Sequence, residues 1–256
     1  MTEFVDTHCH VHFSDYGLDA DEVIRGAIDT DVTRMICVGC TLADSKRGVE
    51  MAAKHKSIWA SIGMHPHEAN FYVENEKALQ ELRDLAGQPR VVAVGEIGLD
   101  YYYNHSSKED QEAMLRYQLE LALEHDLPVI FHVREAFDDF FAIFDEFTGL
   151  KGVVHSFTAS SATLDKCLSR GLYIGLNGIM TFTKDQEQLE MARKVPKDRL
   201  LLETDAPFLT PVPFRGTICQ PKHVVSIAEF LADLRQESLE ELAAATTQNA
   251  LTLFRL

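Results

Sequence analysis

Eight short runs rich in β-branched and other apolar residues alternate along the chain with longer segments of helical periodicity. The runs cover residues 3–7, 33–38, 58–63, 91–96, 128–133, 152–155, 172–175 and 199–203. The segments between and after them predict helices over 20–29, 44–54, 74–86, 108–124, 135–147, 162–170, 186–194 and 221–234. Each intervening segment is long enough to bring the chain back to a parallel strand.

This alternation within 256 residues predicts an α/β protein, a (β/α)8 TIM barrel that forms a single domain over residues 1–256. An open doubly wound sheet is the alternative. Residues 238–254 would add an extra C-terminal helix, because Ser238 and Glu241 have the spacing of a capping box. The chain contains no GxGxxG or Walker sequence, so we expect no nucleotide cofactor.

Composition and charge argue against several classes of function. A formal net charge of −16 does not suit a long basic groove for duplex nucleic acid. The N-terminal residues lack the pattern of a secretory signal, and the longest charge-free stretches, of thirteen residues, are too short to span a membrane. Five cysteines at irregular spacing favour a reducing compartment. We therefore expect a soluble cytoplasmic protein, monomeric or weakly oligomeric, that makes no membrane contact.

Ionisable residues gather where each predicted strand ends. The strand ends read DTHCH at 6–10, GMHPH at 63–67, GEIGLD at 95–100, FHVR at 131–134, VHSF at 154–157 and LETDAP at 202–207. In a parallel barrel all these ends share one rim, the face on which active sites are built. We therefore expect these side chains to converge.

The strand ends together supply the donor atoms of a metal centre. His8 and His10 are two residues apart on an extended segment, so both side chains point to the same side, although such a pair alone could be two ordinary histidines near a turn. The predicted metal ligands are His8, His10, Glu96, His132, His155 and Asp205. Four imidazoles and two carboxylates suit two divalent cations, Mg, Mn or Zn, better than one, because a catalytic zinc takes about three protein ligands.

These motifs, in this order, resemble the TatD-type metal-dependent deoxyribonucleases, a family of the amidohydrolase-like barrels. The resemblance runs from residue 6 to about residue 254 and includes PFRG at 213–216 and TQN at 247–249. It implies that His8, His10 and Asp205 hold one metal together with Glu96. It also implies that Glu96, His132 and His155 hold the second, so that Glu96 bridges the two ions.

Four residues are candidates for catalytic roles: Asp205, Glu96, Glu203 and His65. Asp205 would take the proton of the attacking water, because a carboxylate at the metal orients that water and accepts its proton. Glu203 would fix a ligand histidine, or else form a buried ion pair without a catalytic role. His65 would donate to a substrate oxygen or polarise water, or would only shape the loop before Pro66.

Three further residues are candidates for substrate binding. Arg134 and Arg215 present the planar fork that suits a phosphate, although surface salt bridges would explain both of them almost as well. Tyr102 could stack on a base, or could belong to a packed loop.

The resemblance implies a phosphodiesterase that acts on DNA, a 3′ to 5′ exonuclease. Single strands or chain ends are the expected substrate, since they can enter the mouth of a barrel. A rival hypothesis is hydrolysis of another ester at the same site, such as a lactone or the aminoacyl bond of D-aminoacyl-tRNA. A second rival is a metal-binding interaction protein without enzymatic activity.

Overall fold

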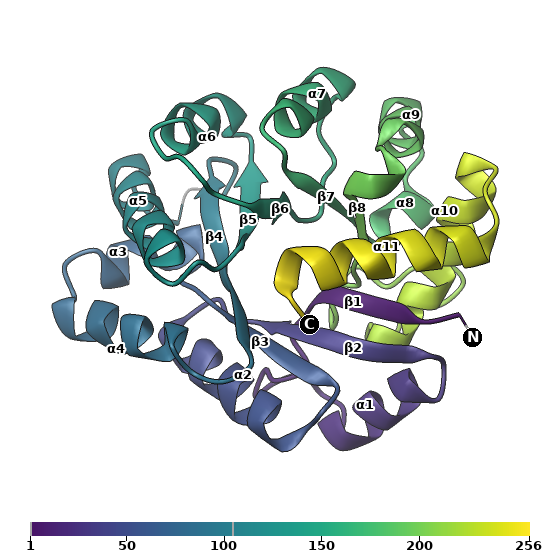
Figure 1. Cartoon of the computed structure of the whole chain (residues 1–256), viewed down its shortest axis with the longest axis horizontal. Helices are drawn as coiled ribbons and strands as arrows, with labels where there is room; N and C mark the ends of the chain where they lie inside the picture. Colours follow the sequence, from purple (N-terminus) through teal and green to yellow (C-terminus); the bar gives the residue numbers. More distant parts are fainter. Residues whose placement is uncertain (1, 104) are drawn as a thin grey trace. The chain divides into compact units, whose positions relative to one another are not determined.

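The computed structural model describes residues 2–103 and 105–256, and its strands alternate with helices as expected (Figure 1). The strands are β1 (Phe4–Cys9), β2 (Val32–Val38), β3 (Ile58–Ile62), β4 (Val91–Asp100), β5 (Val129–Arg134), β6 (Gly152–Val154), β7 (Tyr173–Leu176) and β8 (Leu200–Leu202). They belong to one sheet in the order β1 to β8, which is the order that a (β/α)8 fold requires.

The helices include all those predicted, together with several short ones. The α-helices are α1 (Ala20–Ile28), α2 (Leu42–Lys54), α3 (Ala69–Tyr72), α4 (Glu76–Ala86), α5 (Lys108–Glu124), α6 (Phe137–Phe144), α7 (Ser161–Ser169), α8 (Ile179–Phe182), α9 (Gln186–Lys194), α10 (Val224–Arg235) and α11 (Leu239–Phe254). The 3-10 helices are η1 (Pro66–Glu68), η2 (Lys197–Arg199) and η3 (Pro221–His223). The elements that the sequence missed are η1, α3, α8 and η2, which have three or four residues, too few for a helical period to be visible. No helix among the described residues is long and apolar enough to cross a membrane.

Side-chain caps determine where the helices begin. Asn75 Oδ1 accepts a hydrogen bond from the Ala78 amide, so α4 begins two residues later than the predicted start at residue 74. Ser238 Oγ accepts one from the Glu241 amide at 3.2 Å, which confirms the predicted cap of α11.

The chain divides into two compact units, which we describe separately: unit 1 (Met1–Ile36 and His155–Leu256) and unit 2 (Cys37–Val154). In unit 1 the C-terminal helix α11 packs against β1 and β8. Thr247 Oγ1 donates to the Glu3 carbonyl at 2.8 Å, and Asn249 Nδ2 donates to the Leu200 carbonyl at 2.8 Å. The predicted extra helix is therefore hydrogen-bonded to the strands whose ends carry the HxH and TDAP motifs. The assignment of residues 1–256 to a single domain stays a prediction.

In unit 2 the central strand β4 is longer than predicted and buried along its whole length. Its pairing with β5 is irregular between Val94 and Ile97, and such irregularities re-aim the side chains beside them. A Cβ atom at Gly98 would lie 1.8 Å from the carbonyl oxygen of His132, so only glycine lets the two strands approach this closely. The close pairing brings Asp100 beside the end of β5.

Candidate metal centre

Three side chains of unit 1 bring one donor atom each into a tight triangle. His8 Nε2 lies 3.1 Å from His10 Nε2. Asp205 Oδ1 lies 3.2 Å from His10 Nε2 and 3.6 Å from His8 Nε2. Ligand atoms bound at about 2.0–2.2 Å to one cation are themselves about 3–3.5 Å apart. The triangle therefore has the dimensions of one face of a coordination shell, and its donors fit a divalent cation.

Backbone hydrogen bonds hold the two segments of this triangle side by side. The Asp205 amide donates to the His8 carbonyl at 2.8 Å, and the His10 amide donates to the Ala206 carbonyl at 2.7 Å. Asp205 itself has φ 60°, a left-handed conformation that is uncommon for a residue with a side chain. Burial would raise the pKa of its carboxyl, but a hydrogen bond from His10 and the neighbouring charge of His8 lower it below the usual value. Asp205 is therefore held as a carboxylate that faces both imidazoles.

Hydrogen bonds between the buried residues Asp6 and Thr204 support the backbone on which Asp205 lies. Asp6 Oδ1 accepts the Thr204 amide at 2.9 Å, and Oδ2 accepts the Thr204 hydroxyl at 2.6 Å. The Thr204 hydroxyl oxygen in turn accepts a hydrogen bond from the Ala206 amide at 3.1 Å. The residues before and after Asp205 are therefore both hydrogen-bonded. Burial raises the pKa of Asp6 to about 8, although the hydrogen bonds from Thr204 act in the opposite direction and lower it. The sequence did not predict this role, although Asp6 lies on the same face of β1 as His8.

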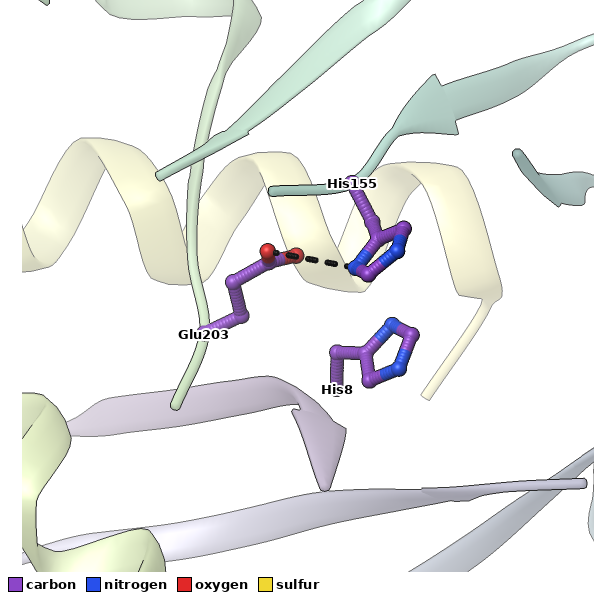
Figure 2. A group of neighbouring side chains, drawn as sticks. All are labelled: His8, His155 and Glu203. Atoms are coloured by element: carbon purple, nitrogen blue, oxygen red, sulfur yellow. Dashed lines mark ion pairs between the residues drawn. The ribbon is translucent and has the colours of Figure 1, made fainter. Parts of the chain in front are cut away.

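His155 joins the same unit at the end of β6, next to His8 (Figure 2). The two imidazole rings are stacked, with centroids 4.1 Å apart and an interplanar angle of 17°. His155 Nδ1 lies 3.6 Å from Oε1 of Glu203, and the same oxygen accepts the Ser156 amide at 2.6 Å. One donor atom each from His8, His155 and Glu203 lies within 4.8 Å of the others. Glu203 is buried behind His155, where it can orient the ring.

Gly175 in β7 leaves the space that the Glu203 carboxylate occupies. A Cβ atom at this position would lie 2.3 Å from Glu203 Oε2. We expect Gly175→Ala to lower the free energy of unfolding by about 1–3 kcal/mol, because the buried carboxylate has to shift. Urea unfolding measures this change. Gly26→Ala is the matched control: position 26 has open space within α1, so alanine should stabilise the protein by about 0.5–1 kcal/mol. Equal stability of Gly175→Ala and the wild type would contradict the packing.

In unit 2, Glu96 lies at the centre of a second group of donors. Its Oε1 lies 2.8 Å from His132 Nδ1 and 3.6 Å from His65 Nε2. Its Oε2 lies 3.6 Å from the thiol sulfur of Cys40. Glu96 is only 4% exposed, so this carboxylate is desolvated and depends on its polar neighbours. One donor atom each from His65, Glu96 and His132 lies within 4.8 Å of the others.

A backbone hydrogen bond determines the tautomer of His65. The His67 amide donates to His65 Nδ1 at 3.1 Å, so in the neutral ring the proton is on Nε2. Burial lowers the pKa of His65 to about 4, which keeps the ring neutral at pH 7. His65 therefore presents an N–H donor at Nε2, which suits a hydrogen bond to an oxygen better than a bond to a metal. It also shapes the loop before Pro66, because its ring nitrogen caps η1.

Asp100, at the end of β4, connects His132, a member of this second group of donors, with an exposed turn. Its Oδ2 lies 3.0 Å from His132 Nε2 and 2.9 Å from His67 Nε2. Its Oδ1 accepts the amides of Tyr102 and Tyr103, each at 3.0 Å. Burial would raise the pKa of Asp100, but the hydrogen bonds from His132 and His67 lower it far below the usual value. A carboxylate in this position can fix the orientation of the His132 ring, a role that the sequence did not predict for Asp100.

We expect Asp100→Asn to weaken divalent-metal binding by about 10- to 100-fold, because an amide orients His132 less firmly than a carboxylate. Isothermal titration of the metal-free protein with Mn²⁺ measures the affinity. Asp84→Asn is the control, since Asp84 is exposed on α4. Unchanged affinity in Asp100→Asn would show that this carboxylate does not position the ligand.

The three predicted substrate-binding residues lie beside aromatic rings, exposed ones for Arg134 and Tyr102 and a half-buried one, Phe182, for Arg215. The Arg134 guanidinium lies 4.1 Å from the ring centre of Tyr102 and 4.7 Å from that of Tyr103, and both rings are 53% exposed. In unit 1 the Arg215 guanidinium lies 3.9 Å from the ring centre of Phe182. Neither arginine has a carboxylate partner within residues 2–103 and 105–256, so the salt-bridge alternative is not observed. Both cations remain available for an anion.

Comparison with known proteins places these motifs in a family. The family model described as TatD related DNase matches residues 5–255. YabD of Bacillus subtilis (strain 168), described as an uncharacterized metal-dependent hydrolase, is 38% identical over 253 residues and covers 98% of each chain. The protein of Erwinia amylovora described as the 3′-5′ ssDNA/RNA exonuclease TatD is 38% identical over 249 residues, which cover 94% of this chain and 95% of that protein.

The structural comparison confirms the predicted TIM-barrel fold. The crystal structure of YJJV, a TatD homologue from Escherichia coli K12, matches with a TM-score of 0.92 at 30% identity, over 100% of this chain and 99% of that chain. The eight strands in chain order agree with this match. The chain therefore belongs to the TatD related DNase family, and it is a metal-dependent hydrolase of that family.

Proposed function

We propose that this protein is a divalent-metal-dependent phosphodiesterase that removes nucleotides from single-stranded DNA or from DNA ends in the 3′ to 5′ direction. The observation that carries the proposal is the triangle of His8, His10 and Asp205, whose donor atoms are spaced as ligands of one cation. The name of the Erwinia amylovora relative, a 3′-5′ ssDNA/RNA exonuclease, supports the substrate and the direction.

The proposed metal assignment follows the sequence prediction of two cations. His8, His10 and Asp205 would hold one of them, and His132 and His155 would belong to the other. That Glu96 serves both ions stays a prediction, which metal analysis tests. A divalent cation bound in such a site lowers the pKa of a coordinated water and polarises a phosphoryl oxygen.

The protein's own groups then position the reactants and move a proton. Asp205 supplies a carboxylate at one corner of the triangle, so it can accept the proton of the attacking water. His65 presents Nε2–H and can donate a hydrogen bond to a phosphoryl or leaving oxygen. Glu203 would orient the ring of His155, whose Nδ1 lies 3.6 Å from the Glu203 carboxylate.

Substrate contacts would come from the exposed cations and rings. Arg134 is oriented in advance by Tyr102 and Tyr103, which reduces the entropy lost when it binds a phosphate. One face of Tyr102 is occupied by the guanidinium, so a base would stack on the other face. Arg215 would bind a second phosphate. The cytoplasmic location and the monomeric or weakly oligomeric state stay predictions from the sequence.

The proposal is tested with end-labelled single-stranded DNA. We expect the purified protein to shorten this oligonucleotide from its 3′ end in the presence of Mg²⁺ or Mn²⁺. EDTA should stop the reaction. Asp205→Asn, purified in the same way, controls for contaminating nucleases. If the wild type shows no chelator-sensitive loss of nucleotides, the nuclease proposal fails. Hydrolysis of an aminoacyl ester or a lactone by the same preparation would then favour the rival hypothesis.

A further inference from the structure

The loop that follows Asp205 differs in charge from the rest of the protein. The chain carries 40 acidic residues, yet none occurs between Asp205 and Glu229, which is the longest acid-free run in the sequence. The same stretch contains two cations, Arg215 and Lys222. This segment therefore contributes positive charge and no negative charge to its surroundings, in contrast to the net charge of −16 of the whole chain.

This acid-free loop also exposes apolar side chains. Phe208 is 52% exposed, Val212 47%, Phe214 40% and Ile218 37%. They are four of the ten large apolar side chains that are exposed in the described part of the chain, and they fall within eleven residues. A loop that exposes so many large apolar side chains is typical of a binding segment.

Contacts within the loop and with His223 support its conformation. Arg215 Nη1 donates to the Thr210 carbonyl at 2.7 Å, and the Thr210 hydroxyl donates to the Thr217 carbonyl at 2.7 Å. The Phe214 ring stacks on His223 with centroids 4.6 Å apart and an interplanar angle of 9°. Four of the eight prolines of the chain lie between residues 207 and 221. A surface fixed in this way loses little conformational entropy when a ligand binds.

Phe208 places this surface next to the metal-binding triangle. Its amide donates to the Asp205 carbonyl at 2.8 Å, so the backbone at Phe208 is anchored three residues after Asp205. Its ring centroid lies 6.4 Å from that of His10. If a phosphodiester binds at this triangle, a planar aromatic group attached to it, such as a nucleobase, would lie within contact distance of the Phe208 ring.

We infer that Phe208 is the ring on which a nucleobase stacks beside the phosphodiester that is cleaved, and that Phe214 and Arg215 continue the same strand-binding surface. The inference rests on the proposed function and specifies its substrate. Every base has a flat face, so a phenyl ring binds bases without sequence preference. Bases paired in a duplex are stacked on one another and cannot cover the ring, so the surface favours single strands.

The test compares two oligomers of equal length and equal charge. One is an oligothymidylate, and the other carries abasic tetrahydrofuran sites in place of all the bases. Wild type, Phe208→Ala and Phe208→Trp are assayed for kcat/KM, and for binding by fluorescence anisotropy of the labelled oligomers. Phe71→Ala is the matched control, because Phe71 is a phenylalanine outside the acid-free loop that is 67% exposed.

We expect Phe208→Ala to lower kcat/KM and affinity for the oligothymidylate by about 5- to 100-fold, the range of one base–aromatic contact. For the abasic oligomer, kcat/KM and affinity of Phe208→Ala should differ from those of the wild type by less than about twofold. Phe208→Trp should restore binding of the oligothymidylate. An equal loss on both oligomers, or no loss on either, would overturn the inference. If the wild type hydrolyses neither oligomer, the nuclease proposal fails, while the anisotropy measurements still decide whether Phe208 binds bases.

Discussion

Asp205→Asn is expected to lower kcat for DNA hydrolysis by about 100- to 10,000-fold, the range that a positioned general base contributes. Asparagine retains the shape of the side chain and can still contact His10, which lies 3.2 Å away. It cannot accept the proton of the attacking water, and it is a weaker ligand for a divalent cation. Single-turnover kinetics at saturating Mn²⁺ separate the loss of the base from the loss of the metal.

The control for this substitution is Asp198→Asn, because Asp198 is 76% exposed and pairs with Arg199 in η2. This variant should hydrolyse DNA at the wild-type rate. If Asp205→Asn retains more than about a tenth of the wild-type kcat at saturating metal, another group accepts the proton and the role assigned to Asp205 is wrong.

Glu96→Ala is expected to reduce the bound metal from about two ions per chain to one or fewer. The Glu96 carboxylate lies 2.8 Å from His132 Nδ1 and 3.6 Å from His65 Nε2, so the substitution removes a carboxylate that faces both imidazoles. Elemental analysis of the dialysed protein measures the metal content, and hydrolysis of single-stranded DNA should fall with it.

Two further variants make the Glu96 result interpretable. Glu96→Gln keeps the volume of the buried side chain, so a loss of metal in this variant does not depend on a packing defect. Glu190→Ala removes a carboxylate that is 57% exposed on α9 and should retain the full metal content. Two ions per chain in both Glu96 variants would contradict the predicted bridging role.

The sequence predicted the fold because its information is local. Runs of β-branched residues and helical periods record which segments are strands and which are helices, and their alternation allows few topologies. The short elements α3 and α8, four residues each, carry no period and were missed. The extension of β4 to Asp100 was missed as well, because glycine and charged residues are rare in ordinary strands.

The candidate site could be predicted as far as its donor atoms, because ionisable groups gathered at the ends of parallel strands are typical of an active site. The spacing of His8 and His10 predicted that both side chains point to the same side, and their ring nitrogens do lie 3.1 Å apart. The supporting groups were not predicted. The bonds of Asp6 to Thr204 and of Asp100 to His132 join residues far apart in the chain, and no local pattern records such pairs.

By itself, the sequence determined the order of strands and helices, the chemical types gathered at the strand ends and the family to which the motifs belong. Only the tertiary structure decided which donor atoms meet, which nitrogen of His65 carries the proton, and that the loop after Asp205 exposes Phe208. The physical reason is that composition and periodicity act over a few residues. Distances between strand ends depend instead on register, bulges and close contacts such as that of Gly98 with β5, which exist only once the chain has folded.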